Sequence, residues 1–264
     1  GAWAMTTAED GNVYLGTLPT AHIMRVDWPT KSLVDVGRPS TTEQYIWQLT
    51  SAIDKKLYGC TFPHAKLVRY DPATGHSEDL GQMSTTQQYA EYIAADNLGF
   101  VYVGIGTAKR DLVAYEIATG RHRSILPARY GGTGFVDVYR GADGCAWAST
   151  APTVWLGLHG WNATVDATWP GPALPACSTA EKTGTSQNVC LLPDGRKIFY
   201  TGGSVTTETE NTNETHVTGY TGRPLNIFRI GLGPNGKVFG STMLPPHVFE
   251  ADPDSDQWAN IDYG

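Results

Sequence analysis

The chain has 264 residues, of which 41% are hydrophobic and 17% charged, with 30 glycines and 16 prolines. Its formal net charge of -7 argues against electrostatic binding to nucleic acid or to an anionic membrane, because binding to either polyanion needs a surplus of Lys and Arg. No apolar run approaches the roughly 20 residues that cross a bilayer, so the composition favours many short strands joined by turns.

One phrase recurs six times along the chain. Each copy starts near an Asp/Gly or Asn/Gly turn and continues into a strand with a central aromatic residue. The copies are 40 to 52 residues apart, which is the period of β-propeller blades. In chain order they read DGNVYLGT (10–17), DKKLYGCT (54–61), LGFVYVGIG (98–106), DGCAWAST (143–150), DGRKIFYTG (194–202) and NGKVFGST (235–242).

Each copy lies in the same larger unit. An apolar strand precedes the turn, and a variable loop, a third strand, a second turn and a polar edge strand follow the phrase. This predicts an all-β fold, a single β-propeller domain over residues 1–264 with six four-stranded blades. Their approximate ranges are 1–38, 39–82, 83–127, 128–183, 184–223 and 224–264. We expect the surplus segments 155–183 and 203–223 to form rim loops.

The ends of the chain leave two alternatives for closing the ring. The chain starts on a first strand and stops on a fourth, so no strand from one end completes a blade begun at the other. Either six blades close by packing alone, or a seventh blade lies outside this sequence; we favour the second.

Cysteines and sequons bear on the compartment. Cys177 and Cys190 are close enough in sequence for a disulfide, and buried thiols are the alternative. Sequons at Asn162 and Asn213 favour a secreted, extracellular glycoprotein. The absence of CxxC pairs, nucleotide loops and zincin motifs predicts no cofactor and no metal, and we expect a monomer with no membrane or nucleic-acid partner.

Loops between second and third strands concentrate the ionisable residues. Proline accompanies histidine in three of them, at His22, His64 and His247, and proline rigidifies a loop that holds an imidazole. His22 and His247 align just before their third strands, whereas His64 falls two residues earlier and is our candidate catalytic base. A histidine that merely caps backbone groups is the alternative at each position.

Aromatic and cationic residues complete a possible pocket. Tyr45, Trp47 and Tyr89 occupy inner strands, where core packing is the alternative role. Cations lie in the third such loop and in inner strands, where they could bind a sugar carboxylate: Lys109, Arg110, Arg140 and Arg229.

The phrases GTLPTAHIMRVD, YGCTFPHAKLVRYDPATG and STMLPPHVFEADPDS resemble the seven-bladed L-rhamnose-α-1,4-D-glucuronate lyases and related rhamnosidases, and more distantly ulvan lyases. The resemblance implies a partner that is an acidic polysaccharide and cleavage of a rhamnose–glucuronate linkage by β-elimination. It also implies His64 as base and His22 or Tyr45 as acid. The carboxylate would be held by Arg140, Arg229 or Lys109, with Trp47, Tyr89, Arg110 and His247 as further binding residues.

Two other functions fit the same pattern. A non-catalytic propeller would use these loops to bind a glycan or a protein without breaking a bond. A metal-dependent, lactonase-like hydrolase would need carboxylate and amide ligands at the axis, for which Glu91, Asp137 and Asn188 or Asn226 are the candidates.

Overall fold

The structure is a computed structural model of the whole chain. It describes residues 1–141, 144–151, 154–165, 181–182, 188–191, 194, 196–201, 204–209, 214–219, 226–233, 235–243, 247–255 and 258–261, and for some strand residues among these only the backbone. Among the described residues, no helix is long and apolar enough to cross a membrane.

The described residues form six antiparallel sheets, and each sheet takes its strands in chain order. The first two sheets are β1 (Ala2–Thr7), β2 (Val13–Thr17), β3 (Ile23–Asp27) and β4 (Ser32–Gly37), then β5 (Tyr45–Ser51), β6 (Leu57–Phe62), β7 (Lys66–Asp71) and β8 (His76–Gln82). The next two are β9 (Tyr89–Ala95), β10 (Phe100–Gly106), β11 (Asp111–Glu116) and β12 (His122–Ser124), then β13 (Asp137–Arg140), β14 (Ala146–Ala151), β15 (Val154–His159) and β16 (Asn162–Val165).

The last two sheets complete the β-propeller fold, which the structure confirms. They are β17 (Glu181–Lys182), β18 (Asn188–Leu191), β19 (Lys197–Thr201), β20 (Ser204–Thr209) and β21 (Glu214–Gly219), then β22 (Asn226–Leu232), β23 (Val238–Met243), β24 (Val248–Ala251) and β25 (Trp258–Ile261). A 3-10 turn, η1 (Ala128–Tyr130), lies between β12 and β13.

Two sequence expectations about the surplus segments are wrong. Residues 155–165 belong to β15 and β16, and residues 204–219 include β20 and β21, so these parts are blade strands and not rim loops. The fifth sheet has five strands, because β17 pairs with β18 although it lies in the range expected for the fourth blade. The strands β20 and β21 are rich in the β-branched residues Thr and Val, which favour strands.

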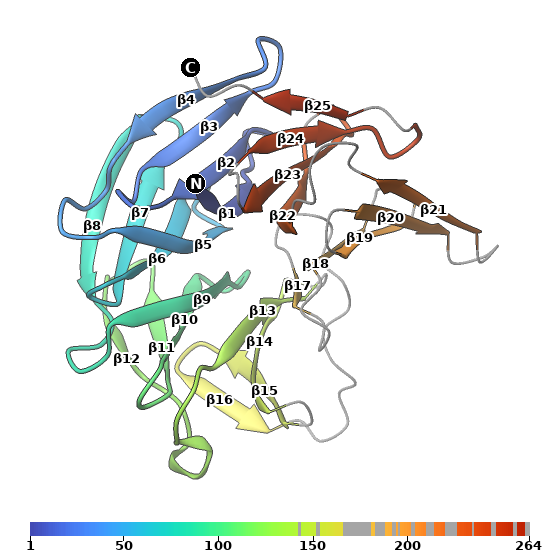
Figure 1. Cartoon of the computed structure of the whole chain (residues 1–264). Coiled ribbons are helices and arrows are strands. Elements are labelled where there is room, and N and C mark those ends of the chain that lie inside the picture. The colour runs from blue at the N-terminus through green and yellow to red at the C-terminus, as the bar shows by residue number, and fades with distance from the viewer. Residues whose placement is uncertain are drawn as a thin grey trace.

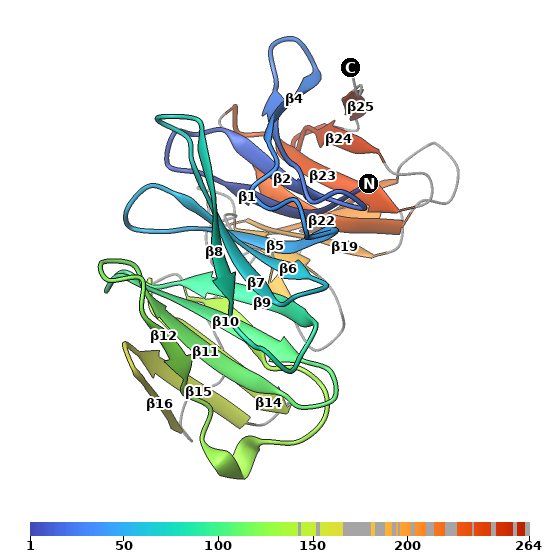
Figure 2. The same cartoon turned by 90° about the vertical axis from the view of Figure 1, so that its left-hand side faces the viewer.

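The sheets pack face to face around a common axis (Figure 1). The innermost strand β5 contacts β1 on one side and β9 on the other, and β9 contacts β13. Figure 2, turned by 90°, shows the first four sheets stacked down the molecule. The first sheet also packs on the sixth, since Met5 and Leu15 share a buried cluster with Phe239 and Val248. Between these two blades the ring therefore closes by side-chain packing.

A buried tyrosine anchors the second strand in each of the first three blades. Its hydroxyl donates a hydrogen bond to the aspartate of the preceding turn, in the pairs Tyr14–Asp10 (2.8 Å), Tyr58–Asp54 (2.8 Å) and Tyr102–Asp96 (2.9 Å). Burial, reinforced by the aspartate, raises the pKa of these tyrosines above its usual value, so the hydroxyls stay protonated donors. The turn and the blade core are thus linked by one contact.

Strand order separates two faces of the disc. Because the strands alternate in direction, the turns between first and second strands lie on one face, here called the turn face, with residues 8–12, 52–56 and 96–99. The loops between second and third strands lie on the other, the loop face, with residues 18–22, 63–65 and 107–110. The linkers between blades, 38–44, 83–88 and 125–136, also lie on the loop face.

Candidate functional site

Three loops of the loop face share one framework. In each, the hydroxyl of a threonine accepts the main-chain N–H of the residue five positions later, in the pairs Thr17–His22 (2.9 Å), Thr61–Lys66 (3.1 Å) and Thr242–His247 (3.0 Å). His22 and His247 therefore hold equivalent positions, and in the second blade that position is a lysine. His64 lies two residues before it.

The first two of these loops also share an unusual backbone. Ala21 and Ala65 have positive φ angles of 51° and 47°, and both are buried. A residue other than glycine is strained at positive φ, and such strain persists only where the surrounding structure enforces it. The Leu18–Pro19 and Phe62–Pro63 peptides are cis. The loop before His22 and the loop around His64 are thus built alike.

A buried carboxylate fixes His64. Glu43, in the linker between β4 and β5, has a side chain that is 0% exposed, and its Oε1 lies 2.7 Å from His64 Nδ1. Its Oε2 accepts the His64 main-chain N–H at 3.1 Å and the Thr61 hydroxyl at 2.7 Å. A carboxylate that receives these donors acts as an acceptor, so Nδ1 donates to it, and in the neutral imidazole the lone pair is then on Nε2. The His64 side chain is 48% exposed.

Lys66 lies beside this dyad and is held by polar groups on two elements. Its ammonium group donates to Asp79 Oδ2 at 2.6 Å and to the Thr42 hydroxyl at 2.9 Å. Burial acts to raise the pKa of Asp79, but hydrogen bonds from Lys66, Ser40 and the Gly81 N–H together hold it below its usual value. The ion pair is therefore present at neutral pH.

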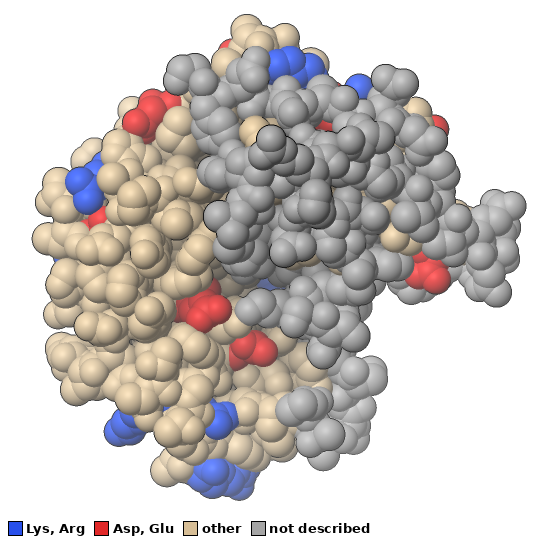
Figure 3. Space-filling model, in the orientation of Figure 1, with Lys and Arg blue, Asp and Glu red and all other residues tan. Residues whose placement is uncertain are grey.

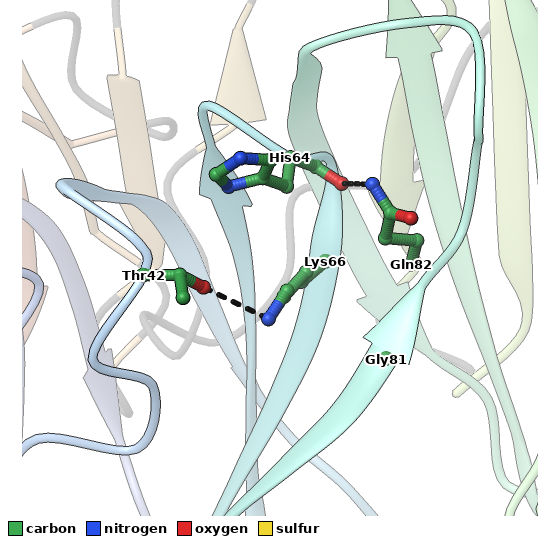
Figure 4. Close-up of a pocket in the computed structure, with 5 residues that line it drawn as sticks. All are labelled: Thr42, His64, Lys66, Gly81 and Gln82. Carbon is green, nitrogen blue, oxygen red and sulfur yellow. Dashed lines mark hydrogen bonds between the residues drawn. The ribbon is translucent and has the colours of Figure 1, made fainter.

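His64 and Lys66 face one open pocket of about 400 Å³. Figure 4 shows its lining residues: Thr42, His64, Lys66, Gly81 and Gln82. The Gln82 amide donates to the His64 carbonyl at 3.2 Å, which ties β8 to the loop. The His64 imidazole, a possible base, and the Lys66 ammonium, a cation, thus line the same pocket.

The first blade contains a pair that corresponds to Lys66 and Asp79, made by other residues. His22 Nδ1 lies 2.7 Å from Asp35 Oδ2, as Lys66 pairs with Asp79, and the Gly37 N–H donates to Asp35. His22 therefore corresponds to Lys66 and not to His64. His247 is half-buried, and Asp262, which follows the same pattern in sequence, lies outside the described residues.

An aromatic belt crosses the first four blades next to the dyad. It consists of six half-buried rings: Trp3, Tyr45, Trp47, Phe62, Tyr89 and Phe135. Tyr45 stacks on Phe62 with ring centroids 5.1 Å apart, and Phe62 lies 4.4 Å from Tyr89. The Trp47 ring lies between Trp3 and Tyr89, with ring-centroid distances of 4.3 Å to Trp3 and 5.9 Å to Tyr89. The sequence-predicted residues Tyr45, Trp47 and Tyr89 are thus brought together here.

The cations of the third blade lie in its corresponding loop. The Lys109 main-chain N–H donates to Gln87 Oε1 at 3.1 Å, and its side chain is exposed. The Arg110 guanidinium donates to the main-chain carbonyl of Thr133 at 2.9 Å and to that of Thr150. Arg110 therefore joins the third blade to the fourth.

Arg140 does not join the pocket, and the expectation that it would bind the same ligand as His64 is not met by its position. It ends β13, and its guanidinium donates to the Ser51 carbonyl at 3.0 Å and to Asn97 Oδ1 at 2.6 Å, both at the turn face. Burial lowers its pKa. Ser51 lies six residues beyond Tyr45 on β5, about 20 Å along an extended strand. The side chain of Arg229 lies outside the described residues.

The candidate metal ligands are described only in part. No group of three His, Cys, Asp or Glu side chains among the described residues could hold a metal ion. Glu91 and Asp137 are half-buried on β9 and β13, while the side chains of Asn188 and Asn226 lie outside the described residues. Cys177 and the side chain of Cys190 also lie outside them.

Sequence reasoning missed Glu43, although the sequence contains a signal for it. The linkers 40–45 and 84–89 read STTEQY and STTQQY, so the glutamate has a glutamine, Gln87, at the same place one blade later. A repeated polar linker indicates a repeated contact, and both residues do accept a main-chain N–H from the loop that follows. Lys66 and Asp79 were also missed, because the sequence alone does not show that they pair with each other.

Comparisons with known proteins bear on the fold. No family model matches the chain, and no curated protein matches it by sequence. Among solved structures, virginiamycin B lyase from Staphylococcus aureus has a TM-score of 0.55 at 12% identity, over 98% of this chain and 83% of that one. The WD40 propeller domain of Doa1 reaches 0.60 at 11% identity, over 91% and 89%.

An auxiliary nutrient binding protein from Bacteroides thetaiotaomicron has a TM-score of 0.59 at 9% identity, over 91% of this chain and 66% of that one. These three proteins differ in what they do, and all are too distant in sequence to transfer an activity. The chain is therefore similar to them as a β-propeller.

Proposed function

We propose that the protein is a lyase that cleaves saccharide chains containing uronic acid, with His64 as its general base. The contact between buried Glu43 and His64 Nδ1 at 2.7 Å carries the proposal. It fixes the tautomer and the ring orientation and leaves Nε2 free to accept a proton in the pocket, which is what a positioned base requires.

The chemistry of β-elimination suits these residues. His64 Nε2 takes the proton from the carbon next to the uronate carboxyl group, the electron pair forms a carbon–carbon double bond, and the bond from the adjacent carbon to the glycosidic oxygen breaks. Negative charge develops on the carboxylate, and the Lys66 ammonium in the same pocket stabilises it. The departing oxygen takes a proton, for which Tyr45 beside Phe62 is our candidate donor.

The aromatic belt supports a saccharide as the ligand. Sugar rings present flat, CH-rich faces and hydroxyl edges, and half-buried Tyr and Trp rings offer large apolar faces with polar groups at their rims. Trp47 Nε1 is buried without a hydrogen-bond partner among the described residues. The belt passes beside the loop that holds His64.

A non-catalytic glycan-binding propeller is the second candidate. The belt alone favours it, because six half-buried rings on one face can bind a saccharide with no bond broken. This candidate predicts binding of the same polysaccharide without any product.

Incubation with gum arabic tests the proposal. Wild-type protein should release rhamnose and form unsaturated uronate, seen as absorbance of the new double bond, and His64→Ala should lower the rate by about 10²- to 10⁴-fold. His76→Ala is the matched control, since His76 is exposed at the start of β8 near the turn face. Equal rates for His64→Ala and wild type would remove His64 from the role, and loss of activity with a chelator would favour a metal-dependent hydrolase.

A further inference from the structure

The third blade repeats the linker–loop contact of the second blade, with lysine in place of histidine. Gln87 Oε1 accepts the Lys109 N–H at 3.1 Å, as Glu43 Oε2 accepts that of His64 at 3.1 Å. His64 and Lys109 also lie three residues before Leu67 and Leu112, which pair with the corresponding residues Cys60 of β6 and Gly104 of β10. Lys109 therefore occupies, one blade away, the position of the proposed base.

The exchange of glutamate for glutamine leaves the lysine charge uncompensated. Gln87 is neutral, and the exposed Lys109 ammonium has no carboxylate within 4.0 Å among the described residues. The Arg110 guanidinium donates hydrogen bonds to the main-chain carbonyl groups of Thr133 and Thr150, which carry no net charge. Arg129, in the linker that follows, is exposed, and its guanidinium lies 4.9 Å from the Tyr130 ring centroid.

The second blade differs from the third in how its cations are neutralised. Its cations are paired with carboxylates, in the pairs Lys56–Asp71, Lys66–Asp79 and Arg69–Glu78. In a chain of net charge -7, three cations on one linker and loop that have no ion pair with any described residue are a local excess of positive charge. Figure 3 shows Lys and Arg side chains in the part of the view where the third and fourth blades lie in Figure 1, and others at the upper and left edges.

We propose that Lys109, with Arg129 of the linker that follows, forms a second subsite that binds a further carboxylate of the same saccharide chain. Adjacent blades are sheets packed face to face, so equivalent positions lie on the order of 10 Å apart. That span is the reach of an oligosaccharide and exceeds one sugar ring. The inference rests on the proposed function and narrows its substrate to chains with a second acidic unit near the one cleaved.

Binding to the His64→Ala protein tests the subsite without any turnover. Calorimetric titration at low salt with gum arabic should show binding that weakens as salt rises, because exposed charges are screened. Adding Lys109→Ala and Arg129→Ala should weaken it about tenfold, since each exposed pair contributes up to ~1 kcal/mol. Carboxyl-reduced gum arabic should bind both proteins equally well.

The matched control removes Lys55 and Arg121, whose side chains are 78% and 70% exposed, and should leave affinity unchanged. No binding of gum arabic, or equal affinity with and without Lys109 and Arg129, would overturn the subsite. Charge-dependent binding without cleavage by wild type would retain the subsite and refute the lyase. Cleavage with no loss of affinity on removing the two cations would do the reverse.

Discussion

Replacing Glu43 with glutamine changes one atom type inside a fully buried contact. Four donors converge on the carboxylate: the Thr61 hydroxyl and His64 N–H on Oε2, and His64 Nδ1 and the Thr42 hydroxyl on Oε1. Glutamine offers one acceptor oxygen and one NH₂ donor, so one of these two sites must change its character.

The main-chain N–H of His64 decides which way the glutamine turns. That N–H cannot reverse, and an NH₂ placed against it would leave two buried donors facing each other at a cost of about 1–3 kcal/mol. The oxygen therefore takes the Oε2 position, as Gln87 Oε1 does toward the Lys109 N–H. The NH₂ then donates to His64 Nδ1, and the ring proton moves to Nε2.

This tautomer has no lone pair on Nε2 and is not a base. A preference of about 2 kcal/mol leaves roughly one molecule in 30 in the active tautomer. The corresponding replacement of the anionic partner of a catalytic imidazole can lower kcat by about 10⁴-fold through the wrong tautomer, so the expected loss lies between about 30-fold and 10⁴-fold. Stability should fall by only about 1 kcal/mol, because the number of hydrogen bonds is kept.

Nitrogen NMR of the neutral imidazole gives the direct readout, with the rate of double-bond formation alongside. Wild type should show His64 protonated on Nδ1, and Glu43→Gln should show it protonated on Nε2 with a rate at least about 30-fold lower. Glu78→Gln, on a partly exposed carboxylate paired with Arg69, is the control and should leave both readings unchanged. An unchanged tautomer in Glu43→Gln, or full activity with the changed one, would refute this reasoning.

Three further changes test the fold around the site. Gly104→Ala should destabilise the protein by at least about 1–3 kcal/mol in denaturant unfolding, because the new Cβ would meet the Val136 carbonyl oxygen at 1.9 Å; unfolding at the wild-type midpoint would contradict it. Tyr58→Phe should cost about 1 kcal/mol through its lost bond to the turn aspartate, and a neutral effect would show that bond to be dispensable. Asp79→Asn removes a carboxylate whose folded pKa is lowered, so its stabilisation by Lys66 is present above the unfolded value near 4 and lost as pH falls through the folded value. The difference in unfolding free energy from wild type should therefore shrink with acidification, and a difference independent of pH would be the contrary result.

The blades could be predicted because their signals are local. Asp and Gly at the turns, period-two strands and the central aromatic residue recur within each unit, and the propeller follows from their spacing. The equivalence of His22 and His247 also follows, since both stand five residues after a threonine.

The composition of the pocket could not be predicted, because it depends on contacts between units. Glu43 reads as a polar linker residue until the next loop folds over it and buries it completely. Arg140 was grouped with loop-face residues, although the end of a first strand lies at the turn face. Strand direction alone would have separated it from His64.

Mass analysis of the gum arabic products tests the lyase most directly. Elimination by the wild-type protein predicts an unsaturated uronate end that is one water lighter than the hydrolytic product, and predicts that His64→Ala forms it about 10²- to 10⁴-fold more slowly. Products that all carry the added water, or no product beside clear binding, would contradict a proton abstraction by His64.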